Sequence, residues 1–162
     1  MYKFLLILYL QLLAVLTVNA QIDSNKLFLE SKGTWQYPVS TPRQITDLAS
    51  NSKYGCLPLM GTQFISAKPS KAFAVTDGRV KSIVFVESYR VIITQFGDFT
   101  ITYVGLQTTT VKQGDFVYRG QEIGYVGYDL NIDSCEIDII LNKERGEKSI
   151  EIPSYQWFSN GP

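Results

Sequence analysis

Two carboxylates stand two residues apart in an apolar stretch near the end of the chain. They are Glu136 and Asp138, within the sequence CEIDIILN. Alternate residues of a β-strand share one face, so both side chains are expected to point the same way. Such a pair could bind a hard cation such as Ca²⁺, or could transfer protons in a metal-free hydrolysis. The simpler interpretation, which we favour, is a solvated acidic face.

Histidine, the usual proton carrier and nitrogen ligand of active sites, is absent from all 162 residues. The charges balance, with 15 Lys+Arg against 15 Asp+Glu. Nucleic-acid binding needs clustered cations, and this neutral chain has no basic run, so a nucleic-acid partner is not expected. A composition of 45% hydrophobic and 13% aromatic residues suits one folded domain.

The first twenty residues have the pattern of a signal peptide. Lys3 precedes an apolar run from Phe4 to Val18, and Val18-Asn19-Ala20 offers small residues for signal peptidase. We predict cleavage after Ala20 and export to the periplasm or beyond, with no stable membrane span afterwards. A retained membrane anchor is the alternative, although the run is short for a span of about 20 residues.

Cys56 and Cys135 are the two cysteines of the chain. An even number of cysteines in an oxidising compartment makes a disulfide possible. The alternative is a pair of small buried hydrophobic residues. The sequence does not decide between them, because it does not give the distance between the two α-carbons.

Beyond the cleavage point the chain changes from polar to β-rich. We expect a polar leader, either mobile or a short helix, at 21–32, an extended entry at 33–39, and a loop with one helical turn at 40–54. Short β-branched and aromatic runs follow, with a hairpin turn at Gly97-Asp98. The predicted strands are 72–75, 79–86, 89–95, 99–104 and 136–141. These features predict an all-β fold, a small sandwich or barrel of antiparallel sheets, with a tail at 159–162.

Two glycine turns, Gly114-Asp115 and Gly120-Gln121, flank a short strand within VKQGDFVYRGQEIGYVG. Biotinyl-type domains and LytM/lysostaphin-type cell-wall peptidases share this pattern. A carrier domain would also need a modifiable lysine in a hairpin between the two halves, and none is found. Four other blocks favour the peptidase: GTWQYPV, LMGTQFISAKPSKAFAVTDGRV, QFGDFTITYVGL and PSYQWF, with CEIDIILN at the expected spacing.

In this order, the blocks resemble the LytM/lysostaphin-type murein metallopeptidases over residues 33–158. The resemblance implies a barrel-sandwich hybrid fold, the duplicated hybrid motif. In that family, zinc is held by a histidine, by an aspartate four residues later, and by the second histidine of a His-x-His strand. Zinc lowers the pKa of its bound water to about 7 and polarises the scissile carbonyl.

The resemblance implies a site that has lost its metal. The ligand positions carry Leu59, Gln63 and Asp138, and Glu136 stands at the other histidine of His-x-His. Gly105 replaces the histidine of the Tyr-x-His-Leu strand. We therefore expect no catalytic residues, no zinc and no other cofactor. Residues that could still line a degenerate binding groove are Leu59, Gln63, Gln95, Tyr103, Gly105, Glu136 and Asp138.

Aromatic residues could stack on sugar rings or hold a partner's peptide along such a groove. They are Trp35, Tyr37, Tyr103, Tyr125, Tyr128, Trp157 and Phe158. We expect most of them to pack in the core or at its rim. Tyr103 is the best groove candidate, since its family counterpart flanks a catalytic histidine.

The resemblance implies a zinc-free pseudo-peptidase of the cell envelope, similar to the amidase activator domains of the EnvC type. Its expected partner is peptidoglycan or an amidase-like murein hydrolase. One alternative is an active endopeptidase that uses a non-standard site, such as Glu136 with Asp138. A second alternative is an accessory module that binds peptidoglycan or peptide.

Overall fold

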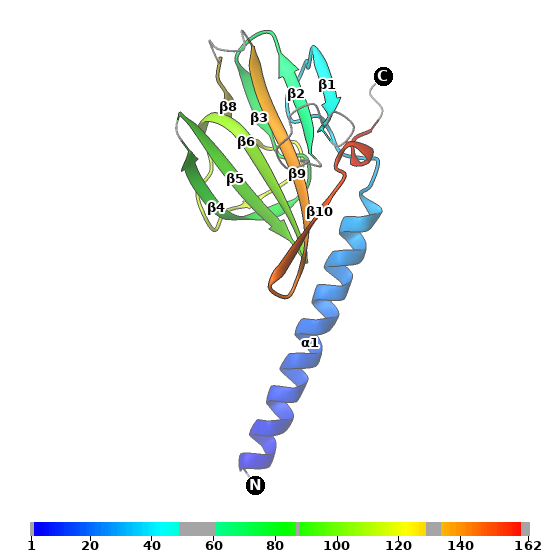
Figure 1. Cartoon of the computed structure of the whole chain (residues 1–162). Helices are drawn as coiled ribbons and strands as arrows, with labels where there is room; N and C mark the ends of the chain where they lie inside the picture. Colours follow the sequence, from blue (N-terminus) through cyan, green and yellow to red (C-terminus); the bar gives the residue numbers. More distant parts are fainter. Residues whose placement is uncertain (1, 49–60, 87, 129–133, 160–162) are drawn as a thin grey trace.

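The structure is a computed structural model that describes residues 2–48, 61–86, 88–128 and 134–159. One helix precedes ten strands and a short 3-10 helix within the described residues, and Figure 1 shows the strands as a layered β domain from which the helix projects. The elements are α1 (Tyr2–Glu30), β1 (Gln44–Asp47), β2 (Thr62–Ser66), β3 (Ser70–Phe73), β4 (Gly78–Val86), β5 (Tyr89–Phe96), β6 (Phe99–Thr109), β7 (Phe116–Val117), β8 (Glu122–Val126), β9 (Cys135–Arg145), β10 (Lys148–Ile152) and the 3-10 helix Tyr155–Trp157.

The strands pair in antiparallel fashion in the order β1-β2-β9-β6-β5-β4-β7. Strand β10 pairs with β9, and β8 pairs with both β3 and β6. The β5–β6 hairpin turns at Gly97, whose φ of +60° suits glycine. The predicted all-β, antiparallel fold is confirmed.

Strand β6 belongs to both layers of the domain. Its first part, Phe99–Val104, pairs with β9, and from Leu106 onward it pairs with β8. Gly105 lies between the two parts with φ +103°, and the register with β5 also shifts there. It is therefore a bulge residue, and such bulges bend a strand and allow it to change sheets.

Segments from the beginning and the end of the domain pack together in its core. Trp35 forms a parallel bridge with Phe158, and the Trp35 and Trp157 ring centroids are 5.1 Å apart. Ser154 is fully buried and donates to the Ile139 carbonyl oxygen at 2.9 Å, while its oxygen lies 2.7 Å from the Thr62 hydroxyl. The C-terminal segment is thereby fixed against β2 and β9.

The segment 21–32, expected as a polar leader, is helical as far as Glu30. Phe28 is 2% exposed, and its ring stacks on Phe99 at 4.2 Å. The Asn25 side chain donates to the Asp98 carboxylate at 2.6 Å and accepts from the Asp98 amide at 2.8 Å. Of the two alternatives, mobile leader or helix, the structure has the helix, because Phe28 completes an aromatic cluster of the domain.

Other boundaries differ from the expectations. Residues 44–47 form β1 instead of loop or helical turn, because Ile45 packs on the core and the segment pairs with β2. The first predicted strand, 72–75, lies at Ser70–Phe73. Strands β6 and β9 run to Thr109 and Arg145, and β10, which was not predicted, extends the sheet beyond β9.

In the part of the chain that the structure describes, no helix combines the length and apolar character needed to cross a membrane.

Candidate functional site

Gln63 and Asp138 face each other across neighbouring strands. They are direct partners in the register of β2 with β9, and the Gln63 side chain hydrogen-bonds the Asp138 carboxyl group. Glu136 lies two residues earlier on β9, opposite Ile65. The structure thus brings together two positions that the family resemblance assigns to zinc ligands, Gln63 and Asp138, and the position of the other histidine of His-x-His, Glu136.

The Asp138 carboxyl group lies in an environment that disfavours its charge. Burial, followed by the nearby charge of Glu136, raises its pKa from 3.8 to about 7, although the Gln63 hydrogen bond acts in the opposite direction. Its Oδ1 atom is buried without a hydrogen-bond partner. A buried carboxylate with an unsatisfied oxygen is costly, so Asp138 keeps its proton up to a much higher pH than an ordinary aspartate and is about half protonated at pH 7.

Gly105 occupies the bulge of β6 beside the Glu136 backbone. A β-carbon at this position would overlap with the carbonyl oxygen of Glu136, and φ is +103°. No side chain fits there without movement of β9. Gly105 is therefore a close-packing residue, at the position where the family resemblance predicts a histidine in other members.

Tyr103, the expected groove aromatic, is a core residue, so that expectation is wrong. It is fully buried, and its hydroxyl accepts from the Val75 amide at 3.1 Å and bonds the Thr94 side chain. Burial raises the pKa of its hydroxyl to about 12. The side chain faces inward because residues alternate along β6 up to the bulge.

Gln95 is not part of the same cluster. It pairs with Thr100, four residues along β6 from Val104, which is the partner of Asp138. Its amide donates to the Gly97 carbonyl oxygen at 3.1 Å and so stabilises the β5–β6 turn.

Leu59 and Cys56 lie outside the described residues. Cys135 is a free thiol in this structure, is 1% exposed, and has its pKa raised by burial. Because Cys56, its only possible partner in the chain, is not described, the disulfide stays a prediction.

The donors present do not fit zinc. Structural and catalytic zinc sites use imidazole, thiolate and carboxylate ligands, at least three from the protein. The two described ligand positions offer one neutral amide and one carboxyl group whose pKa is raised to about 7. The third position is a leucine in the sequence, which has no donor atom. No group of three or more histidine, cysteine or acidic residues suitable for a metal occurs within the described ranges.

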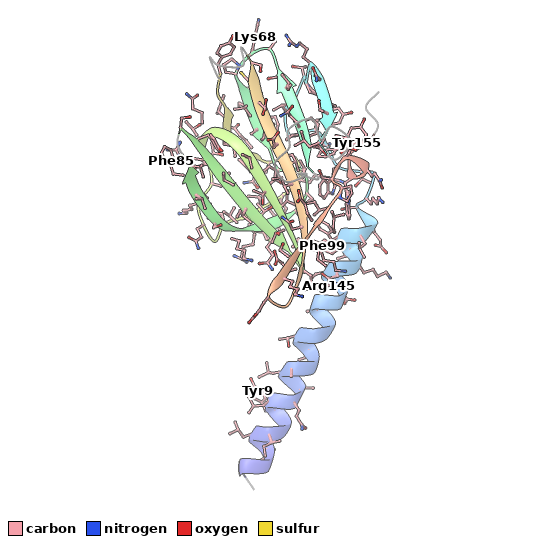
Figure 2. The ribbon with its side chains drawn as sticks, in the orientation of Figure 1. Tyr9, Lys68, Phe85, Phe99, Arg145 and Tyr155 are labelled. Carbon is pink, nitrogen blue, oxygen red and sulfur yellow. The ribbon has the colours of Figure 1, made fainter. Side chains whose placement is uncertain are left out.

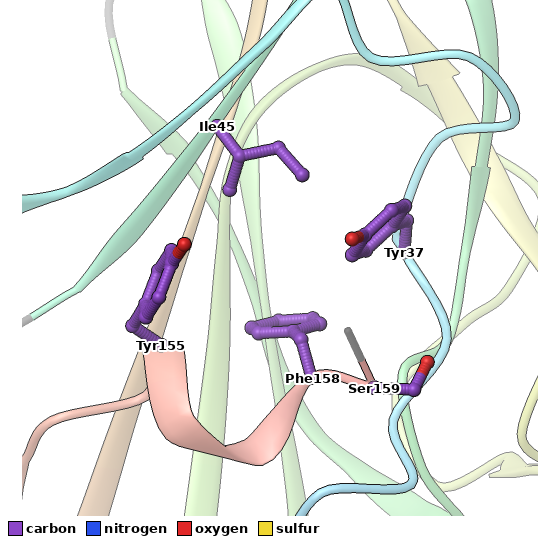
Figure 3. A pocket seen from close by; sticks show the side chains of 5 residues that line it. All are labelled: Tyr37, Ile45, Tyr155, Phe158 and Ser159. Carbon is purple, nitrogen blue, oxygen red and sulfur yellow. The ribbon is translucent and has the colours of Figure 1, made fainter. Parts of the chain in front are cut away.

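A shallow pocket, lined by none of the residues of this cluster, lies between β1 and the 3-10 helix. Figure 3 shows Ile45, Tyr37, Tyr155 and Phe158 around it, with Ser159 at one side. Sequence reasoning placed Tyr37 and Phe158 among the ambiguous aromatics and missed Ile45 and Tyr155. Aromatic walls could hold an apolar side chain, and Tyr37, Tyr155 and Ser159 add hydroxyl groups to the lining.

The fold is a β-sandwich of the type found in peptidases of the M23 class. The family description Peptidase family M23 matches residues 58–140, and the chain belongs to this family. No curated protein sequence matches the chain.

Several solved structures are similar in fold. A zinc-containing peptidase from Vibrio cholerae is 22% identical, with a TM-score of 0.54, and the match covers 71% of this chain and 37% of that one. The catalytic domain of the prophage-encoded M23 protein EnpA from Enterococcus faecalis is 18% identical, with a TM-score of 0.58, covering 74% and 95%. A chain of the SpoIIIAH and SpoIIQ complex is 18% identical, with a TM-score of 0.54, covering 72% and 96%. This chain thus spans well under two thirds of the Vibrio protein.

Proposed function

We propose that this protein is an exported, zinc-free member of family M23 that binds a partner in the cell envelope instead of cleaving peptidoglycan. The observation that carries the proposal is the Gln63–Asp138 pair. An amide and a carboxyl group with a pKa of about 7 replace metal ligands. Gly105 adds to this, since its bulge leaves no room for the family's remaining imidazole.

The proposed partner is peptidoglycan or an amidase-like murein hydrolase. The retained β-sandwich supports a recognition role, because a fold can persist as a binding scaffold after its chemistry is lost. One similar fold comes from a complex of two proteins, SpoIIIAH and SpoIIQ, which supports protein binding by this kind of domain. In this proposal, binding to the amidase releases its activity.

Two measurements test the proposal. Metal analysis of the purified protein is expected to find no stoichiometric zinc, and incubation with muropeptides is expected to give no cleavage beside an active M23 peptidase as positive control. Chelator-sensitive cleavage would sink the proposal. Stimulation of a murein amidase separates the activator from an accessory module, which would sediment with sacculi and leave amidase activity unchanged.

A second candidate is hydrolysis by Glu136 and Asp138 without metal. The raised pKa of Asp138 beside a second carboxyl group favours it, since a proton donor near neutral pH is useful in catalysis. Cleavage that survives chelator and disappears in Asp138→Asn, but not in Glu147→Gln, would establish this reaction.

A further inference from the structure

Strand β4 has a partly unpaired outer edge. It pairs with β5 along its length, but with β7 only through Gly78 and Arg79. On the same edge, the Val80 amide donates to the Asp115 carbonyl oxygen, and the Val80 carbonyl oxygen accepts from the Gly114 amide, both at 2.8 Å. After Val80, no backbone hydrogen bond joins this edge to another described residue.

The register shows which groups face outward. The backbone amide and carbonyl of Val80 point away from β5. The register shift between Val80 and Ser82 places one extra residue in β4 relative to β5. Since antiparallel pairing alternates, Ser82, Val84 and Val86 then bond toward β5. The amides and carbonyls of Ile83 and Phe85 are directed outward, where they can pair with one more strand.

The side chains of this segment resemble those of an interior strand. Val84 is 44% exposed, Phe85 65% and Val86 36%, so apolar groups are exposed on both faces. Figure 2 shows Phe85 at the outer edge of the domain. The Arg90 guanidinium lies over the Phe85 ring, 5.4 Å from its centroid. Edge strands usually carry charges or irregularities that prevent pairing, and strands apolar on both faces are usually interior.

The charges of β4 and β5 indicate what this edge can bind. The two strands carry Arg79, Lys81 and Arg90 and contain no acidic residue. A second copy would bring the same cations, whereas a strand with acidic side chains would be complementary. We propose that the outer edge of β4, from Ser82 to Val86, binds an extended, apolar segment of a partner protein that has acidic residues beside it. This inference rests on the proposed binding role and assigns it a surface.

The first test uses two synthetic peptides and the whole exported protein. Both have six alternating valines and threonines, one with glutamate and the other with lysine at each end. Fluorescence anisotropy is expected to give at least about tenfold tighter binding of the glutamate peptide. Lys81→Glu should reverse the preference, and Lys148→Glu, which changes another exposed cation, on β10, should leave it unchanged. No binding of either peptide, or no effect of Lys81→Glu, overturns the proposal.

Amide hydrogen exchange locates the binding. In the free protein, the Ile83 and Phe85 amides should exchange faster than those of Ser82, Val84 and Val86. The glutamate peptide should slow the first two. Protection elsewhere, with Ile83 and Phe85 unaffected, overturns the assignment.

A third test separates this inference from the proposed function. Phe85→Asp is expected to abolish amidase stimulation, whereas Tyr118→Asp, at a 64% exposed aromatic, is not. Equal stimulation by both variants overturns the edge assignment and leaves the function standing. Peptide binding without any amidase stimulation supports the binding edge on β4 and contradicts the proposal that the partner is an amidase. A dimer in sedimentation that Phe85→Asp dissociates shows that a second copy covers the edge, contrary to the proposal.

Discussion

Gly105 is packed against the backbone of Glu136 so closely that the two strands leave no volume for a β-carbon. The contact joins the point where β6 changes sheets to the backbone of Glu136, one of the two acidic residues of the candidate site. Any side chain at this position would therefore require the β9 backbone to move.

Gly105→Ala should destabilise the fold by about 3 kcal/mol, through overlap with the Glu136 carbonyl and an unfavourable φ. Gly114→Ala is the matched control, because Gly114 has a similar φ of +92° but nothing within 4 Å of the added carbon. That variant should cost about 1 kcal/mol. Urea unfolding measures both, and equal losses would show that close packing contributes nothing.

Asp138 should make the protein less stable as pH rises. Its folded pKa of about 7 exceeds the ordinary 3.8, so the folded protein retains a proton that the unfolded chain loses. The protonated Asp138 therefore contributes stability that is fully present below about pH 4. This contribution is lost between about pH 4 and pH 7, at a rate of at most about 1.4 kcal/mol per pH unit.

Asp138→Asn removes this pH-dependent loss. The change that it causes in the free energy of unfolding should consequently be about 2 kcal/mol more favourable at pH 8 than at pH 4. Glu147→Gln, at an exposed carboxylate, is the control and should show no such pH dependence. Urea denaturation at pH 4, 6 and 8 provides the values. The same change at all three pH values would refute the burial of this charge.

The end of α1 should contribute to the stability of the domain. Phe28→Ala removes a buried ring in contact with Phe99 and Trp157 and should cost about 3 kcal/mol. Leu29→Ala, whose side chain is 51% exposed on the same helix, should cost less than about 0.5 kcal/mol. Thermal unfolding compares the two, and similar melting temperatures would indicate that the helix is not docked.

Tyr103→Phe should destabilise the protein by about 1–3 kcal/mol, because the Val75 amide loses its buried acceptor. Tyr118→Phe, which changes an exposed hydroxyl, should have almost no effect. If binding of a partner changes while stability does not, Tyr103 is a recognition residue after all.

The sequence predicts the hairpins better than it predicts the site. The Gly97-Asp98 turn and the strands beside it depend on local chemistry, namely positive φ and β-branched runs. The end of β5 and the start of β6 accordingly lie within one residue of the predicted positions. The opposition of Gln63 to Asp138 depends on the register between strands distant in sequence, and only the family resemblance pointed to it.

Other features could not be read from residue types. Tyr103 looks like a groove residue by analogy, but the alternation of side chains along β6 before the bulge at Gly105 directs it into the core. Phe28 stands in a polar segment without clear periodicity, and its burial arises from tertiary contacts with Phe99 and Trp157. Such long-range packing overrides local composition.

The neighbouring indoles of Trp35 and Trp157 give the protein a built-in optical reporter. They are the only tryptophans of the chain, and both are buried beside Phe28. Emission from this pair should shift to the red as soon as water reaches either ring. Detachment of the amino-terminal helix would then be visible before the strands separate, without any added dye.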